Sequence, residues 1–217
     1  MNVWAIPQKQ FKILKKLNTP VKIQDFLDKM PINFEPNGDT CLSPLLVLEQ
    51  NTCHCIEAAV LAALALRLNG QPPLILDLTA VRNDFDHVIA VFKKGKQWGA
   101  ISKTNHAVLR YREPIYNSIR ELVMSYFHEY LDDLGRKTLR SYSWPVNLKR
   151  FDKLGWMTAK EEIGYIPEYL VKVKHFPILT ENQIRNLRLA DPIEIKAGQL
   201  IEWKGKMVLY KAATFKS

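Results

Sequence analysis

The chain has 217 residues, of which 47% are hydrophobic and 24% charged, so it can bury the core of one large domain, or of one domain with a smaller appendage. Its longest apolar run, over residues 58–66, is shorter than the roughly 18 to 20 residues that span a bilayer, which argues against a membrane-spanning helix. No secretory signal is visible, and the three cysteines, Cys41, Cys53 and Cys55, do not suit a disulfide framework, so we expect a cytoplasmic protein.

The net charge of +9 is unevenly distributed along the chain. Residues 1–135 hold 15 Lys and Arg against 14 Asp and Glu, whereas residues 136–217 hold 16 against 8. An anionic partner, such as nucleic acid, is one explanation of this basic C-terminal part. Dispersed charges that aid solubility are the simpler explanation, because no basic run exceeds two residues and no nucleic-acid-binding motif accompanies them.

Two helices are predicted in the first third of the chain. Thr19 followed by proline is typical of a helix cap, and it predicts a helix over about 20–29. Prolines and an Asn-Gly pair indicate a loop-rich stretch over 31–44. A helix of small apolar residues then begins at position 53 or 55 and continues to 68, where Asn69-Gly70 predicts its end.

Strands follow this alanine-rich helix. Apolar runs predict strands over 74–78, 88–92 and 98–101, with a turn over 94–96 between the last two. A helix followed by three or more strands is typical of an α+β domain with an antiparallel sheet, and this is the fold class we expect.

The second half of the chain returns to helical patterns. Apolar residues at helical spacing predict a long helix over about 115–134, closed by Gly135. Shorter helical stretches follow, and residues 200–203 and 207–210, on either side of Lys204-Gly205, predict a hairpin. We expect a core over residues 1–140 with an N-terminal helix, and a basic extension over 141–217 that is separate or packed on the same domain.

Cys55 is the strongest candidate for a reactive side chain. The start of a helix carries roughly half a positive elementary charge, which favours the thiolate, the form of cysteine that attacks carbonyl carbons. Glu57, in the same first turn, carries the negative charge that such a position favours. Cys53 is the competing nucleophile, but it precedes the helical pattern and would receive less of this field.

His87 is the candidate base for this thiol. It precedes a strand whose alternation places His87, Ile89 and Val91 on one face and Asp86 on the other. Asp86 is therefore badly placed to orient the imidazole ring, and we expect the third member of the site to come from a neighbouring strand. A Cys-His pair of this kind is used in nucleophilic acyl transfer.

Residues 48–105, under a third of the chain, resemble the core of the transglutaminase-like (papain-related) superfamily. The resemblance lies in Cys55 at a helix start, Gly70 fifteen residues later, His87 opening an aliphatic strand, and Trp98 on the next strand. It implies a helix bearing the nucleophile, packed on an antiparallel sheet. It also implies thiol-dependent hydrolysis or acyl transfer at an amide or peptide bond of a protein or peptide, without a cofactor.

One position departs from the family pattern. A catalytic aspartate lies four residues after the tryptophan in that family, and Ser102 occupies this position here. A serine accepts or donates a hydrogen bond but carries no charge. Asn105 could orient the ring as a papain-type asparagine does, and we favour it narrowly over Ser102. Asp77, on the preceding strand, is a third alternative.

The resemblance further implies an oxyanion hole, formed by the N–H of the nucleophile and one upstream donor. Gln50 or Asn51 could supply that donor, although either could equally be a loop residue that caps a helix.

Other functions are less well supported. Cys53, His54, Cys55, His87 and His106 include enough zinc-type ligands for a metal site, but their spacing is unlike that of zinc motifs, so we expect no metal. The main alternative is a non-catalytic module of the same fold, which binds a protein or nucleic-acid partner through its cleft or its basic C-terminal region. The serine at the aspartate position favours that alternative.

Overall fold

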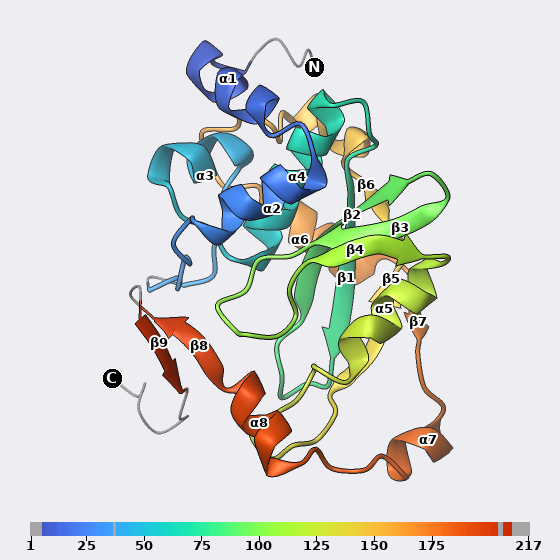
Figure 1. Ribbon diagram of the computed structural model, residues 1–217. Helices are drawn as coiled ribbons and strands as arrows, with labels where there is room; N and C mark the ends of the chain where they lie inside the picture. The colour runs from blue at the N-terminus through green and yellow to red at the C-terminus, as the bar shows by residue number, and fades with distance from the viewer. Residues whose placement is uncertain (1–5, 37, 204–205, 210–217) are drawn as a thin grey trace.

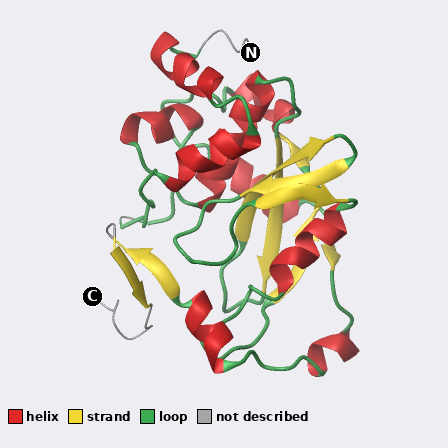
Figure 2. Cartoon of the chain, viewed as in Figure 1, coloured by secondary structure: helices red, strands yellow, loops and turns green. Residues whose placement is uncertain are grey.

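The computed structural model describes residues 6–36, 38–203 and 206–209. Its main sheet is antiparallel and has strands of unequal length (Figures 1 and 2). The strands of this sheet lie in the order β4-β3-β2-β1-β5-β7, and the short β6 also pairs with β1. Their bounds are β1 (Leu74–Ala80), β2 (His87–Lys94), β3 (Gln97–Ile101), β4 (Arg112–Tyr116), β5 (Leu139–Ser143), β6 (Val146–Asn147) and β7 (His175–Pro177). All pairings are antiparallel, which confirms the predicted α+β class with an antiparallel sheet.

Helices cover the sheet, and a separate hairpin lies at the lower left of Figure 1. The helices are α1 (Gln8–Lys16), α2 (Pro20–Asp28), α3 (Pro44–Gln50), α4 (Cys55–Leu68), α5 (Ile119–Phe127), the 3₁₀ helix η2 (Leu148–Leu154), α6 (Tyr165–Lys172), α7 (Glu181–Arg185) and α8 (Pro192–Gly198). The hairpin consists of β8 (Leu200–Trp203) and β9 (Lys206–Leu209). Within the described residues, no helix is long and apolar enough to cross a membrane.

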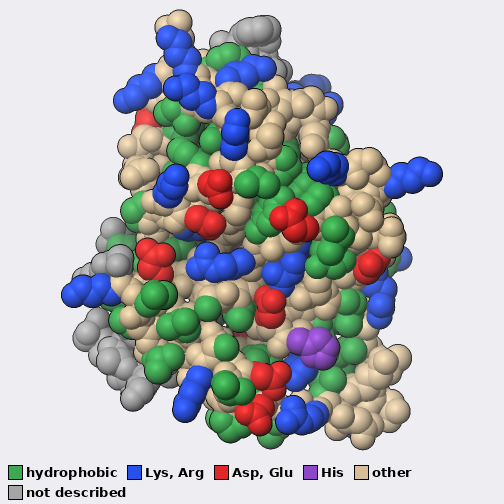
Figure 3. Space-filling view, viewed as in Figure 1, with side chains coloured by type: hydrophobic (Ala, Val, Ile, Leu, Met, Phe, Trp, Pro, Cys, Tyr) green, Lys and Arg blue, Asp and Glu red, His purple; other side chains and the backbone are tan. Residues whose placement is uncertain are grey.

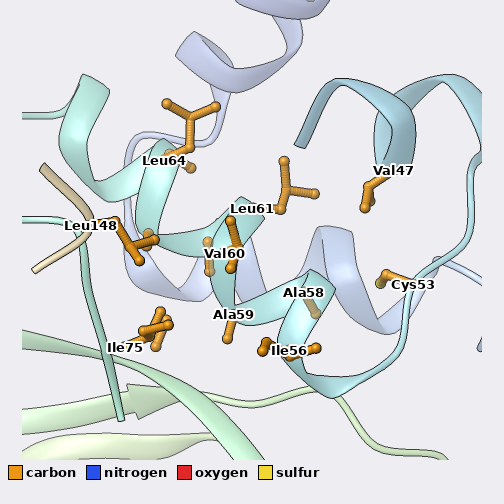
Figure 4. Close-up of a cluster of buried hydrophobic side chains, with 14 of the residues drawn as sticks. Val47, Cys53, Ile56, Ala58, Ala59, Val60, Leu61, Leu64, Ile75 and Leu148 are labelled. Carbon is orange, nitrogen blue, oxygen red and sulfur yellow. The ribbon is translucent and has the colours of Figure 1, made fainter. Parts of the chain in front are cut away.

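Helix α4 is the centre of the larger hydrophobic core. Every residue from Ile56 to Leu66 is buried, so the helix is enclosed on all sides. It contacts α1, α2 and α3 on one side and β1 and β2 on the other. Figure 4 shows Leu61 of this helix together with Val47 of α3 and Ile75 of β1. Because alanine side chains are small, the neighbouring backbones can approach α4 closely.

The opposite face of the sheet packs against α5. Strand alternation divides the two cores: Ile75 and Ala90, which are paired across β1 and β2, belong to the core around α4. Their neighbours Leu76 and Ile89 belong to the core that also contains Leu122 of α5. The sheet is therefore buried on both faces at β1 and β2, where His87 begins β2.

Several predicted elements are confirmed with small changes of boundary. Helix α2 begins at Pro20, and Thr19 caps it by accepting a hydrogen bond from the Lys22 N–H. Helix α4 begins at Cys55 and not at Cys53. The three strands predicted over 74–101 correspond to β1, β2 and β3. Helices α1 and α3 have no counterpart among the predictions.

The predicted long helix over 115–134 is wrong. Its first residues belong to β4, and α5 occupies only Ile119–Phe127. Ser118 starts the helix by accepting a hydrogen bond from the Glu121 N–H. Pro114 lies in an edge strand and between the pairs Trp98–Tyr116 and Ala100–Arg112, where the register shifts, and proline is tolerated at such irregular positions.

The C-terminal part of the chain joins the same sheet and the same core. Position 140 lies within β5, and β7 pairs with β5 at the end of the sheet. Asp152 in η2 forms a two-pronged ion pair with Arg67 of α4 at 2.5 Å and 2.7 Å, and also accepts a hydrogen bond from Trp156 Nε1. Trp156 is fully buried in the core around α4.

The predicted hairpin is present as β8 and β9, while its predicted turn at Lys204-Gly205 and its last residue, Tyr210, lie outside the described residues. Strand β8 pairs with the loop that follows β3. The Ala107 N–H donates to the Leu200 carbonyl, and the Glu202 N–H donates to the Asn105 carbonyl, both at 2.8 Å.

We predict that Gly99→Ala destabilises the protein because β3 and β4 are too close at this position for a methyl group. An added Cβ would lie 2.8 Å from the Arg112 carbonyl oxygen and 2.6 Å from Phe92 Cζ. We expect a loss of about 1–3 kcal/mol, the usual cost of overpacking, measured by urea unfolding. Gly164→Ala is the control, since nothing lies within 4 Å of its added Cβ. Equal stability of the two variants would contradict the close approach.

Candidate active site

Cys55 is the first residue of α4, and His54 is the residue that precedes it. The first N–H groups of a helix have no partner within the helix, and they give this end a partial positive charge. Residue Cys55 is partly exposed, unlike the buried Ile56 and Glu57 that follow it. The thiol therefore lies at the positive end of a buried helix, on the one partly exposed residue of this turn.

The Glu57 carboxylate is fully buried and holds the chain around this helix end. It accepts hydrogen bonds from the backbone N–H groups of His54 (3.0 Å) and Leu42 (2.9 Å). It also accepts from Thr40 Oγ1 at 2.9 Å and from Asn33 Nδ2 at 3.2 Å. Burial alone would raise the pKa of the Glu57 carboxyl, but the hydrogen bonds from His54 and from these N–H groups lower it to about 2. The loop over 33–42 is thereby attached to the start of α4.

His54 connects this carboxylate to the thiol. Its Nε2 lies 3.1 Å from the Thr40 carbonyl oxygen and 3.4 Å from carboxylate oxygens of both Glu35 and Glu57. These groups only accept hydrogen bonds, so Nε2 carries a proton. Its Nδ1 lies 4.0 Å from Cys55 Sγ. Burial opposes the charged form of the ring, but hydrogen bonds with Cys55 and Glu57 outweigh it and raise the pKa of His54 well above the usual range.

His87 reaches the same thiol from the start of β2. Its ring lies close enough to Cys55 to lower the pKa of the thiol, and its Nε2 lies 2.7 Å from Ser102 Oγ. The Ser102 hydroxyl donates its single hydrogen to the Leu109 carbonyl oxygen at 2.5 Å. The serine oxygen must therefore accept from His87 Nε2–H, which leaves Nδ1 for the sulfur.

The imidazoles of His54 and His87 determine the protonation state of the Cys55 thiol. Burial alone would raise the pKa of Cys55, but hydrogen bonds with His54 and His87 lower it to about 5. Cys41 and Cys53 are buried in the core, and burial raises the pKa of both thiols, that of Cys53 to about 12. Of the three cysteines, Cys55 alone is placed to be a thiolate at neutral pH.

The hydrogen bond on the far side of His87 comes from Ser102 and not from Asn105, which the sequence narrowly favours. Ser102 immediately follows β3, the strand beside β2, so this hydrogen bond comes from the residue next to the neighbouring strand. The Asn105 carbonyl accepts from Glu202 of the hairpin. The two aspartates weighed as ring partners have other contacts: Asp77 contacts His175 Nε2 at 3.0 Å, and Asp86 accepts from the Ala80 N–H.

Gln50 and Asn51 lie at the end of α3. Gln50 is exposed, and Asn51 has a left-handed backbone (φ 53°) and donates its N–H to the Val47 carbonyl. Asn51 therefore caps α3, which is the structural role that the sequence leaves open. The Cys55 N–H lies at the start of α4, where the backbone N–H groups have no partner within the helix.

Two groups of the site were missed by the sequence analysis. His54 was considered only as a metal ligand, although its position between two cysteines was a visible signal. Gln24 is a buried amide of α2 that accepts from the Ser102 N–H at 3.0 Å and donates to the Ser102 carbonyl at 2.8 Å. The buried Lys103 ammonium donates to the carbonyls of Leu27 (2.8 Å) and Met30 (2.6 Å), which attaches the next residue to the end of α2.

A cavity of about 530 Å³ lies elsewhere, at the C-terminal end of α4. It is lined by Phe11, Lys15, Arg67, Leu68, Gly70, Gln71, Pro72 and Lys149. Since α4 has fourteen residues, this cavity is roughly 20 Å from Cys55 and is not part of its surroundings. Across the described ranges of the chain, no group of three or more His, Cys, Asp and Glu side chains is arranged to hold a metal ion.

Comparison with known proteins adds no assignment, since no protein-family model and no curated protein matches this chain. The interpretation of the site therefore depends on its geometry.

We predict that iodoacetamide alkylates Cys55 selectively, with a rate that rises through a midpoint near pH 5. The low midpoint follows from the two hydrogen-bonded imidazoles, which favour the thiolate. In His54→Ala and His87→Ala we expect the midpoint to move toward about 8.5, the ordinary value for cysteine. Mass spectrometry of quenched samples measures both the site and the rate. A midpoint near 8.5 in the wild-type protein would contradict the arrangement.

We predict that Glu57 makes the stability of the protein depend on acid pH. Its carboxyl titrates near 2 in the folded protein and near 4.3 when unfolded, so the ionised form stabilises the fold above about pH 5. This contribution, roughly 3 kcal/mol, is lost as the pH falls from 5 to 2.

Urea unfolding of the wild type and of Glu57→Gln at several pH values measures this loss. The difference between the two proteins should shrink on acidification. Glu161→Gln, at an exposed position, is the control and should parallel the wild type. A difference that is constant with pH would show that the Glu57 charge is unimportant.

Proposed function

We propose that this protein is a thiol-dependent hydrolase or acyltransferase that acts on amide or peptide bonds, with Cys55 as nucleophile and His87 as general base and acid. One observation carries the proposal. Cys55 lies at a helix N-terminus, close enough to His87 for this histidine to lower the pKa of the thiol, and Ser102 holds the His87 Nε2 atom at 2.7 Å. A nucleophile, a base and a group that orients the base are the minimum that such chemistry requires.

In the proposed reaction, the Cys55 thiolate attacks the carbonyl carbon of the substrate amide. The oxyanion that forms is stabilised by the Cys55 N–H and the positive end of α4. His87 donates its Nδ1 proton to the leaving amine, which breaks the C–N bond and leaves a thioester on the sulfur. Water or a second amine, deprotonated by His87, then resolves the thioester, giving hydrolysis or transfer.

His54 has a different role in this mechanism. A group whose pKa is far above the working pH holds its proton too tightly to act as a general base. With the carboxylates of Glu35 and Glu57 at 3.4 Å, His54 is a fixed cation beside the sulfur. We assign it to the electrostatic stabilisation of the thiolate, and we assign the proton transfers to His87.

The order of elements supports a transglutaminase-like core as part of the proposal. Cys55 begins the buried α4, His87 begins β2, and Trp98 lies on β3, which is paired beside β2 in an antiparallel sheet. Ser102, at the position of the family's aspartate, orients the ring without a charge. The nearest negative charges lie instead on the His54 side of the thiol.

The same core suggests a protein or peptide substrate. Cys41, Cys53 and Cys55 are all free thiols, which suits a reducing compartment such as the cytoplasm. No cofactor has a step in the proposed chemistry.

A non-catalytic binding module is the second candidate, and the uncharged Ser102 is the observation that favours it. A nucleic-acid partner for the basic C-terminal part has less support. On the face drawn in Figure 3, Lys and Arg side chains are interspersed with Asp and Glu instead of forming one patch.

The test is turnover of fluorogenic peptide and amide substrates, with and without an added primary amine, together with mass spectrometry of acid-quenched reactions. We expect an acyl group on Cys55 and no turnover in Cys55→Ala. His87→Ala should be slower by about 10²- to 10⁴-fold, the usual contribution of general acid–base catalysis. His54→Ala should lose activity mainly at low pH.

Cys53→Ala is the matched control and should keep its activity, since this thiol is buried in the core. A wild-type protein with a reactive Cys55 that forms no acyl-enzyme with any substrate would favour the binding module.

A further inference from the structure

Leu109 has a backbone conformation that is unusual for its residue type. Its φ is 61°, in the left-handed region that side chains with a Cβ rarely adopt. The peptide groups on both sides of its Cα form hydrogen bonds with side chains. Its carbonyl accepts from Ser102 Oγ at 2.5 Å, and its N–H donates to Glu129 Oε2 at 2.8 Å. A strained residue that is held from both sides is a typical feature of functional sites.

Glu129 is itself held in one position. Its Oε2 also accepts from Arg112 Nη2 at 2.6 Å, and the Arg112 guanidinium carbon lies 4.1 Å from the centre of the Tyr126 ring. Arg112 Nε donates to Ser125 Oγ at 3.0 Å. The carboxylate that receives the Leu109 N–H is therefore fixed between β4 and α5.

The Leu109 carbonyl determines the orientation of the Ser102 O–H bond. While this carbonyl takes the hydroxyl hydrogen, the serine oxygen can only accept from His87 Nε2–H. If the carbonyl moved away, the hydroxyl could rotate and donate to Nε2. His87 would then hold its proton on Nδ1 as a neutral ring, and it could no longer take the proton of Cys55.

We propose that Glu129 is a positioning residue for the Cys55–His87 pair, because it holds Leu109 in the conformation that makes Ser102 a hydrogen-bond acceptor. This inference rests on the proposed function. It explains how an uncharged serine selects the ring tautomer that a base needs. A wrong tautomer with intact geometry is costly in other nucleophile–histidine sites, where it lowers turnover by about 10⁴-fold.

Three variants separate positioning from general stability. Glu129→Ala removes the acceptor of the Leu109 N–H. Glu129→Gln loses the charge but keeps a side-chain oxygen for this N–H. Glu121→Ala, the matched control on α5, also removes a carboxylate that accepts from a backbone N–H, that of Asn117, but this N–H is outside the loop over 102–109.

The first readout is the pH dependence of Cys55 alkylation by iodoacetamide. We expect the alkylation midpoint of Glu129→Ala to rise from near pH 5 to pH 6 or above, so that alkylation at pH 5 is slower by about fivefold. Glu129→Gln should stay closer to the wild type, and Glu121→Ala should match it. In a Ser102→Ala background, Glu129→Ala should have no further effect, because the hydroxyl through which it acts is absent.

The second readout is the ¹⁵N chemical shifts of the His87 ring, measured in a Cys55→Ala background at a pH where the ring is neutral. We expect the Nε2–H tautomer with Glu129 present and a shift toward Nδ1–H in the Glu129→Ala, Cys55→Ala protein. The assignment comes from loss of the signals in a His87→Ala variant.

The outcomes distinguish this inference from the proposed function. A wild-type alkylation midpoint near the ordinary value would overturn the Cys55–His87 pair itself. A low wild-type midpoint that Glu129→Ala leaves unchanged, with an unchanged His87 tautomer, would overturn the role of Glu129 alone. An effect of Glu121→Ala equal to that of Glu129→Ala would show that the loss reflects stability and would also overturn it.

Discussion

The buried carboxylate of Glu57 is the interaction on which the candidate site depends. A fully buried charge is costly unless it is hydrogen-bonded, and this one accepts from groups of His54, Leu42, Thr40 and Asn33. The same contacts close the loop over 33–42 against the start of α4 and hold His54 beside Cys55. A structural requirement, the satisfaction of one buried charge, thereby places a cation and a helix end next to the thiol.

The charges around Cys55 are distributed asymmetrically. On one side, His54 lies between the sulfur and the carboxylates of Glu35 and Glu57, which keep its ring protonated. On the other side, His87 faces Ser102, a neutral group that can orient a ring without holding a charge on it. In the proposed mechanism, this division makes His54 a fixed cation and assigns the proton transfers to His87.

The loop over 102–109 is where separate parts of the chain meet. Gln24 of α2 holds the Ser102 backbone, Glu129 holds Leu109 from beyond α5, and β8 pairs with the residues in between. The hydrogen-bond partners of the loop that orients His87 thus come from the N-terminal helices, the middle of the chain and the C-terminal hairpin. The geometry of the pair is therefore a property of the complete fold.

The sequence alone determined those helices and strands whose limits are set by residues close together in the chain. Caps, turn residues and alternation were sufficient to predict α2, α4 and the strands β1 to β3, and to place Cys55 at a helix start and His87 at a strand start. They failed over 115–134, where helical spacing continued into the end of β4, because sheet pairing outweighs local pattern at an edge strand.

Tertiary structure alone decided the hydrogen-bond partners of the candidate site. Whether Ser102 or Asn105 faces His87, and that Gln24 and Glu129 belong to the site, depends on contacts between residues up to 78 positions apart, which no local pattern encodes.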